Sequence, residues 1–191
     1  MPDKLTHPDG PFEGFRSYLT LLARAGLGKY LQAKIDPSDV VQQTLLEAVQ
    51  AAAQARALSA AGRAAWLRQI LTRNLASVAR DFSRDKRAVG REQSLEQFLE
   101  QSASNLGAWL AGGGTSPSHH VQNEENAIRV AQSLERLPDK QREAVVLRHF
   151  ENRSLAEIGA ALGCSTTAVA GLIYRGLKSL RQDLGVSEEM A

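Results

Sequence analysis

Residues 154–181 read SLAEIGAALGCSTTAVAGLIYRGLKSLR, and this stretch predicts two helices joined by a tight turn. Ser154 followed three residues later by Glu157 forms a capping-box pattern, so a helix is expected to begin there. Gly163 is expected to end that helix, because glycine tolerates the left-handed backbone found at helix C-termini. After a short turn, Ser165 can cap the second helix.

Both predicted helices have one apolar face. The residues expected to point inward are Leu155, Ile158 and Leu162 in the first helix, and Val169, Ile173, Gly176 and Leu180 in the second. The opposite face of the second helix carries hydroxyl, aromatic and basic residues: Thr166, Thr167, Tyr174, Arg175, Lys178 and Arg181. This pattern is typical of the helix-turn-helix that reads the major groove of DNA. The alternative is an αα-hairpin whose charged face is only solvated.

The composition favours an all-α fold. Aromatic residues make up 5% of the 191 residues, whereas Ala, Leu, Gln and Arg are abundant. This length suits one or two domains with a real core. The single cysteine, Cys164, excludes an internal disulfide and a cysteine-rich zinc site. We expect it to be a small buried thiol in the turn, with a redox sensor as the alternative.

Charge is segregated along the chain although the net charge is only +2. Residues 63–91 contain eight Lys or Arg and two Asp, whereas residues 92–128 contain five Glu and no Lys or Arg. This pattern predicts a polyanion-binding surface on the first segment and a solvated connector in the second.

The sequence contains no combination of residues typical of a catalytic site. There is no glycine-rich phosphate loop and no Ser/His/Asp or Cys/His arrangement at useful spacing. The adjacent His119 and His120 have no acidic or cysteine neighbour, so we expect no metal and no cofactor. No apolar run reaches the roughly 18 residues of a membrane span, and the N-terminus has no signal-peptide core. We therefore expect a cytoplasmic protein that is not an enzyme and does not insert into membranes.

The sequence Asp36-Pro37-Ser38-Asp39 predicts a helix start, with a capping Asp and Pro at the first position. This helix should bury Val41, Leu45, Ala48 and Ala52, whereas Asp39, Gln42, Gln43 and Leu46 lie on its other side. Such a surface suits a protein contact, although Asp39 alone could simply complement the helix dipole. A preceding helix with Phe15, Leu19, Leu22 and Ala23 inward is expected to end near residues 26–28.

After a break at residues 59–62, a further helix is predicted to have opposed apolar and polar faces. Its apolar face comprises Leu67, Leu71, Leu75, Val78 and Phe82, and its polar face Gln69, Arg73, Ser77, Arg80 and Arg84. Asn74 lies at the border, and the basic line continues through Lys86, Arg87 and Arg91. Nucleic acid is the natural partner of such a line. Spacing does not decide whether Trp66 packs inward.

Two helical domains are predicted, at residues 12–95 and 122–185, joined by a flexible linker at 96–121 that contains GGGTSPSHH. The second should begin with a helix near Asn123 that turns Ile128, Ala131 and Leu134 inward, followed by another at residues 140–150. We expect no direct contact to hold the two domains together in a free monomer.

Two segments resemble bacterial extracytoplasmic-function (ECF) sigma factors. DPSDVVQQTLLEA with AAWLRQILTRNLASVARDFSRDKR resembles their domain two, and LPDKQREAVVLRHF followed by the helix-turn-helix resembles their domain four. The resemblance covers about residues 12–184. The helix-turn-helix alone is unspecific, whereas the Asp-x-x-Gln helix followed by Trp-Leu and Arg-Asn-Leu-Ala is much more specific.

The resemblance implies a non-enzymatic sigma subunit that binds core RNA polymerase, through its β′ and β subunits, and directs promoter-specific transcription initiation. Docking on β′ would fall to Asp39, Gln42, Gln43 and Leu46. Single-stranded −10 DNA would be held by Arg73, Asn74, Arg80, Arg84, Lys86 and Arg87. The −35 element would be read by Ser165, Thr166, Thr167, Ala170, Tyr174, Arg175 and Lys178. The resemblance leaves open whether an anti-sigma protein is a further partner.

The second helix departs from the family after Val169. Basic and polar residues are common there, but this chain has Ala170, Gly171 and Leu172. Three interpretations stay open: weak −35 binding, closer approach of the backbone to the groove, or a different partner for this domain. The competing function is a helix-turn-helix regulator that does not dock on polymerase.

Overall fold

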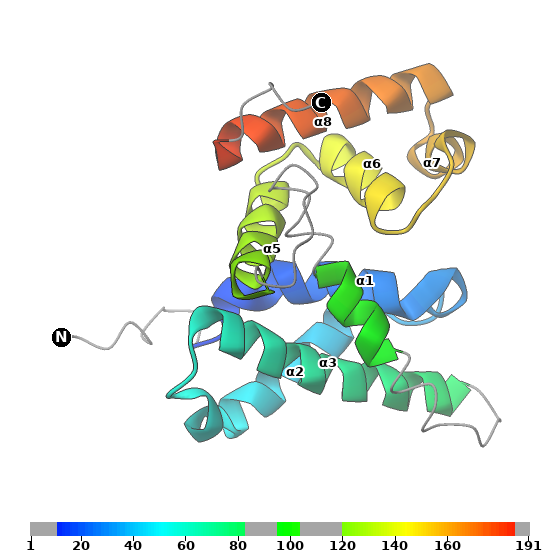
Figure 1. Cartoon of the computed structure of the whole chain (residues 1–191). Coiled ribbons are helices and arrows are strands. Elements are labelled where there is room, and N and C mark those ends of the chain that lie inside the picture. Colours follow the sequence, from blue (N-terminus) through cyan, green and yellow to red (C-terminus); the bar gives the residue numbers. More distant parts are fainter. Residues whose placement is uncertain (1–10, 83–94, 104–119, 186–191) are drawn as a thin grey trace.

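The computed structural model describes residues 11–82, 95–103 and 120–185, and the regular elements in these ranges are all helical, which confirms the predicted all-α class. In chain order (Figure 1) they are η1 Glu13–Phe15, α1 Arg16–Gln32, α2 Pro37–Gln50, η2 Ala52–Ala55, α3 Ala60–Phe82, a helix at 95–103, α5 His120–Glu135, α6 Asp139–His149, α7 Leu155–Leu162 and α8 Thr166–Leu184. We call residues 11–103 the N-terminal half and residues 120–185 the C-terminal half.

Helices α1, α2 and α3 pack on one another in the N-terminal half. The predicted start of α2 is confirmed: Asp36 Oδ1 accepts a hydrogen bond from the Ser38 N–H at 2.8 Å, and Pro37 is the first helical residue. The backbone and side-chain hydrogen bonds from Ser38 lower the pKa of Asp36. Trp66, whose direction was left open, packs inward against Phe12 with ring centroids 5.6 Å apart.

Helix α1 does not end near residues 26–28 as predicted but continues to Gln32. Gly26 lies inside it at a close contact rather than at a turn. A Cβ atom at Gly26 would lie 2.9 Å from Leu75 Cδ1 and 3.3 Å from Leu99 Cδ2. The missing side chain therefore lets α3 and the helix at 95–103 approach α1 closely.

The helix at 95–103 lies within the range predicted as a flexible linker, and it docks through the fully buried Leu99. Helix α5 likewise begins at His120, before the predicted boundary. Residues 104–119, which include most of GGGTSPSHH, lie outside the described residues. The boundaries 12–95, 96–121 and 122–185 remain predictions.

The helix-turn-helix is confirmed in detail. Ser154 and Glu157 form both hydrogen bonds of a capping box, and Gly163 ends α7 with φ +64°. Ser165 Oγ then accepts from the Ala168 N–H at 3.2 Å to begin α8. Ile158 and Val169 are fully buried in the small core between α6, α7 and α8.

Two residues of this motif are less buried than predicted. Leu155, expected to point inward, is 36% exposed at the first position of α7. Cys164 is only half-buried, packed against the edge of the core between α7 and α8. Leu155 is the first residue of α7 and Cys164 follows its last turn, so both lie at the edge of the motif rather than in its middle.

The two halves are in direct contact, contrary to our expectation. One apolar core contains Leu22 and Leu71 of the N-terminal half together with Val130, Leu134 and Leu180 of the C-terminal half. Helix α5 packs on both α1 and α3, and Figure 1 shows it extending from these helices toward α6 and α8.

Within the described part of the chain, no single helix is long and apolar enough to cross a membrane. Helices α7 and α8 would meet that requirement only if taken together, and they are bent by 94° at the turn.

Candidate nucleic-acid interface

The outward face of α2 carries the residues predicted for polymerase docking. Asp39, Gln42, Gln43 and Leu46 are all exposed, whereas Val40, Val41, Thr44, Leu45 and Ala48 are buried against the rest of the N-terminal half. Gln43 Nε2 donates to Glu47 Oε1 at 2.8 Å along this face. The helix therefore separates a packed side from an unpacked one along its whole length.

Val49 belongs to the same face and was missed from the sequence. It is 49% exposed and follows Leu46, which is 53% exposed, by three residues, so the two side chains are neighbours on the helix. Two adjacent exposed aliphatic residues beside glutamines make a small amphipathic patch. The signal in the sequence was the spacing of Val49 from Gln42 and Leu46, which places all three on one side of α2.

The outward face of α3 carries the predicted basic line as far as the structure describes it. Gln69, Arg73, Ser77 and Arg80 are exposed, opposite the buried Leu67, Leu71 and Leu75. Arg84, Lys86 and Arg87 lie outside the described residues. The described part of the face thus presents two guanidinium groups and two uncharged polar side chains to solvent.

Asn74 differs from its neighbours on α3 because its side chain is engaged within the fold. Its Nδ2 donates to Thr44 Oγ1 at 3.1 Å, and the buried Thr44 hydroxyl donates in turn to the Val40 carbonyl at 2.8 Å. This chain of hydrogen bonds ties α3 to α2. Asn74 is half-buried, so part of the side chain still reaches the surface.

The outward face of α8 presents every residue predicted for the −35 element. Those residues are all exposed: Ser165, Thr166, Thr167, Ala170, Tyr174, Arg175 and Lys178. Tyr174 is the most prominent, with 64% of its surface exposed. Figure 1 shows α8 on the opposite side of the molecule from α2 and α3.

Gly171 gives α8 an unusual surface. Its hydrogen-only side chain leaves room for the Arg175 guanidinium, because a Cβ atom there would lie 3.2 Å from Arg175 Nη1. Ala170 beside it is also small, so at these two positions the surface of α8 consists of a methyl group and the Arg175 guanidinium that lies over Gly171. A second glycine, Gly176, faces inward, where a Cβ atom would lie 2.9 Å from Val145 Cγ2 of α6.

The exposed faces of α2, α3 and α8 lack the features of a reaction centre. No group of three or more His, Cys, Asp or Glu side chains in residues 11–82, 95–103 and 120–185 could hold a metal ion. The faces instead offer amides, hydroxyls, guanidinium groups and a few aliphatic side chains, which suit binding of a protein surface and of phosphate or base edges.

Comparison with known proteins finds sigma factors of bacterial RNA polymerase. Residues 127–180, from the second half of α5 through α6 and α7 to most of α8, match the family model of Sigma-70, region 4. The chain is 28% identical to the ECF RNA polymerase sigma factor SigD of Mycobacterium tuberculosis over 181 residues, which is 94% of this chain and 77% of SigD.

Shorter segments match other sigma factors more closely. The chain is 33% identical to the ECF RNA polymerase sigma factor SigW of Bacillus subtilis over 75 residues, which is 39% of this chain and 40% of SigW. It is 47% identical to the RNA polymerase sigma-E factor of Streptomyces coelicolor over 51 residues, 27% of this chain and 29% of that protein. These two matches therefore cover less than half of each relative.

The region 4 match coincides with the observed helix-turn-helix, and the SigD match extends through the N-terminal half with its α2 and α3 surfaces. The chain belongs to the ECF RNA polymerase sigma factors, a family that is not enzymatic.

Proposed function

We propose that this chain binds core RNA polymerase through the exposed face of α2 and directs promoter-specific transcription initiation. The observation that carries the proposal is the amphipathic patch on α2. Leu46 and Val49 are about half exposed beside Gln42 and Gln43, while the opposite side of the same helix already supplies the core. Such a mixture of aliphatic and polar side chains is typical of a protein contact.

The face of α3 is proposed to hold the opened strand of the −10 element. Arg73 and Arg80 would contact phosphates, together with Arg84, Lys86 and Arg87 of the following segment. Electrostatic contacts of this kind follow the backbone of a single strand without reading its bases. Asn74, whose amide nitrogen already binds Thr44, has only its remaining hydrogen-bonding capacity for DNA.

Helix α8 is proposed to enter the major groove of the −35 element. The small side chains at Ala170 and Gly171 would let the helix backbone come close to the base edges once the Arg175 side chain moves off Gly171 toward the DNA. Arg175 and Lys178 would contact bases or phosphates, and Tyr174 and the hydroxyls of Ser165, Thr166 and Thr167 would complete the surface. With few cations on this helix, the −35 contribution should depend less on salt than the −10 contribution.

The proposed function also implies specific partners, a monomeric state and a location in the cell. Docking would involve the β′ and β subunits of polymerase, and the free protein would be a monomer that works in the cytoplasm, where polymerase and promoter DNA are found. An anti-sigma partner would compete for the same exposed face of α2. Equilibrium sedimentation of the purified chain tests the monomeric state directly.

Polymerase docking is tested with the double variant Asp39→Ala/Gln42→Ala. Losing two central polar contacts should weaken core binding by about 2–4 kcal/mol, which is about 30- to 900-fold in Kd. The variant should unfold within about 1 kcal/mol of the wild type, because both side chains are exposed. Fluorescence anisotropy of the labelled chain with core polymerase measures the Kd.

Gln182→Ala, at an exposed position near the end of α8, is the matched control and should bind core polymerase normally. Equal Kd values for the double variant, the control and the wild type would remove α2 as the docking surface. A wild-type chain with no measurable affinity for core polymerase would favour a helix-turn-helix regulator instead.

A further inference from the structure

A cavity of about 260 Å³ lies where α1 and the helix at 95–103 meet α5, α6 and α8. Four of the side chains that line it are aliphatic and buried: Val130, Leu134, Val145 and Leu180. An apolar cavity of about 150 Å³ is large enough to hold benzene. The volume here therefore suits a molecule of about ten heavy atoms.

Polar side chains line another part of the cavity. Gln101 and Ser102 come from the helix at 95–103, His149 from α6 and Asn152 from the loop after α6. Partial burial lowers the pKa of His149 below its ordinary value of 6.5, so the imidazole is neutral at pH 7. Among the described residues that line the cavity, none then carries a formal charge, but several can donate or accept a hydrogen bond.

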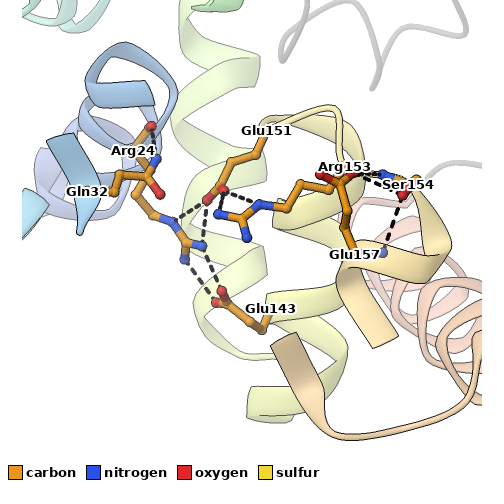
Figure 2. A network of polar contacts seen from close by, with 7 residues as sticks. All are labelled: Arg24, Gln32, Glu143, Glu151, Arg153, Ser154 and Glu157. Carbon is orange, nitrogen blue, oxygen red and sulfur yellow. Dashed lines mark hydrogen bonds and ion pairs between the residues drawn. The ribbon is translucent and has the colours of Figure 1, made fainter. Parts of the chain in front are cut away.

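Ion pairs around Arg24 fix the wall of the cavity at one end (Figure 2). Arg24 immediately precedes Ala25, and Glu151 immediately precedes Asn152; Ala25 and Asn152 both line the cavity. The Arg24 guanidinium donates to Glu151 Oε1 at 2.8 Å and to Glu143 Oε1 at 2.7 Å. Movement of α1 toward α6 or the loop after it would have to break these contacts. The cavity therefore does not close by collapse of its walls.

The loop after α6 is held in one conformation. Asn152 has φ +52°, a left-handed backbone that asparagine adopts more readily than most residues. The Arg153 N–H donates to the Leu147 carbonyl at 2.9 Å, and Arg148 Nη1 donates to the Arg153 carbonyl at 3.0 Å. The Arg153 side chain pairs with Glu151 at 2.7 Å (Figure 2). Asn152 thus lines the cavity from a fixed backbone, which reduces the entropy lost when its amide binds a partner.

We propose that this cavity is a binding site for a small uncharged molecule of about ten heavy atoms, mainly apolar and with one hydrogen-bonding group. Its apolar part would contact the four aliphatic side chains, and its polar group would face Gln101, Ser102 and Asn152. An ionised molecule is disfavoured because it would lose hydration without meeting an opposite charge. An occupant also restores the dispersion contacts that atoms lining an empty cavity lack. The site is separate from the α2, α3 and α8 surfaces of the proposed function and does not depend on it.

Quinoline is the probe, because it has the required size, no charge at neutral pH and one acceptor nitrogen. N-methylquinolinium has the same rings with a permanent charge and is the matched comparison. Methyl NMR titrations of the full chain measure both affinities. Quinoline should bind with a Kd of about 0.1–1 mM and shift the methyl signals of Val130, Leu134 and Leu180. N-methylquinolinium should bind at least about 10-fold more weakly.

The variant that fills the cavity is Ala25→Leu. Ala25 is half-buried and lines the cavity, so a longer side chain there would take the space that the probe needs. Quinoline binding should weaken at least about 10-fold. Ser102→Leu fills the cavity from the helix at 95–103 and provides the same test if Ala25→Leu does not fold. The control is Thr20→Leu, at a half-buried position of α1 outside the cavity lining, which should bind quinoline like the wild type.

Thermal unfolding gives a second measurement. Quinoline at about ten times its Kd should raise the melting temperature of the wild type and of Thr20→Leu by about 3–6 °C, and that of Ala25→Leu by less than about 1 °C. Methyl signals that do not saturate with quinoline, equal quinoline affinities for the wild type and the filled variants, or equal affinities for the two probes would overturn the proposal. These measurements contain no polymerase or DNA, so their outcome is independent of whether the proposed function holds.

Discussion

Three glycines of the helix-turn-helix stand in three different environments, and these decide what an added methyl group would do. At Gly159 a Cβ atom would lie 2.7 Å from the Cys164 carbonyl oxygen, so the turn itself excludes a side chain. At Gly176 it would meet Val145 of α6. At Gly171 it would meet the far end of the Arg175 side chain, which can move.

We therefore predict opposite effects for two substitutions in one helix. Gly171→Ala should raise the free energy of unfolding by about 0.5–1 kcal/mol, because alanine loses less backbone entropy in a helix interior. Gly176→Ala should lower it by about 1–3 kcal/mol, because the added methyl overpacks the contact with Val145. Urea denaturation followed by circular dichroism measures both. Two changes of the same sign would contradict the observed environments.

Asn74 illustrates what could not be predicted at the residue scale. Its position at the border of the α3 faces was correct, but a periodic pattern does not show which hydrogen-bond partner lies across the gap between two helices. That partner, Thr44, is a buried hydroxyl on α2. Val49 was assigned to neither face of α2, although its spacing from Gln42 and Leu46 places it on the exposed one.

At the scale of single elements, helix ends were predicted correctly where the residues responsible act within one helical turn. Asp36 with Pro37, Ser154 with Glu157, and Gly163 all stand at helix ends as predicted, because each satisfies backbone groups that a helix end leaves unpaired. Gly26 was wrongly predicted to end a helix. A glycine is present there because of tertiary packing, since it makes room for Leu75 and Leu99. The helix at 95–103 was assigned to the linker because polar residues dominate this stretch, although Leu95, Phe98 and Leu99 recur there at helical spacing.

The exposed arginines of α3 should make DNA binding depend on salt. Each cation that neutralises a phosphate of single-stranded DNA contributes about −0.7 to the slope of log K against log salt. Arg73→Ala/Arg80→Ala should therefore flatten the slope for holoenzyme binding to an opened −10 strand by about 1.4. Both residues are exposed, so stability should change by less than about 0.5 kcal/mol each.

Arg136→Ala is the control for this experiment, since it removes an exposed arginine from outside α3. Titrations between about 50 and 200 mM salt separate a lost phosphate contact from a general change in charge. Identical slopes for the double variant and the control would show that the arginines of α3 are only a solvated surface.

At the scale of the whole molecule, the contact between the halves had no signature in the sequence. Arg24 and Glu143 are separated by 119 residues, and neither belongs to a local pattern that distinguishes it from an ordinary surface charge. The same holds for Tyr18 and Glu124, separated by 106 residues. Helices and their exposed faces could be predicted, whereas their assembly depends on pairings over long distances in the chain.

The contact between the two halves should depend on pH through Glu143, which pairs with Arg24 across it. Because Arg24 lowers the pKa of Glu143 in the folded chain, the contact is fully stabilising above the ordinary value of 4.5. This stabilisation should be lost as the pH falls below that value toward the lowered pKa. Small-angle X-ray scattering should show a larger radius of gyration on acidification, and Glu143→Gln should already be larger at neutral pH and respond less. A radius that is independent of pH in both proteins would contradict this role of Glu143.

The central claim is that this chain programs core RNA polymerase for promoters, and run-off transcription with purified core polymerase and genomic promoter fragments tests it most directly. We predict discrete transcripts that require the chain, that Asp39→Ala/Gln42→Ala abolishes or strongly reduces, and that Gln182→Ala leaves unchanged. Absence of any transcript that depends on the wild-type chain would contradict the account.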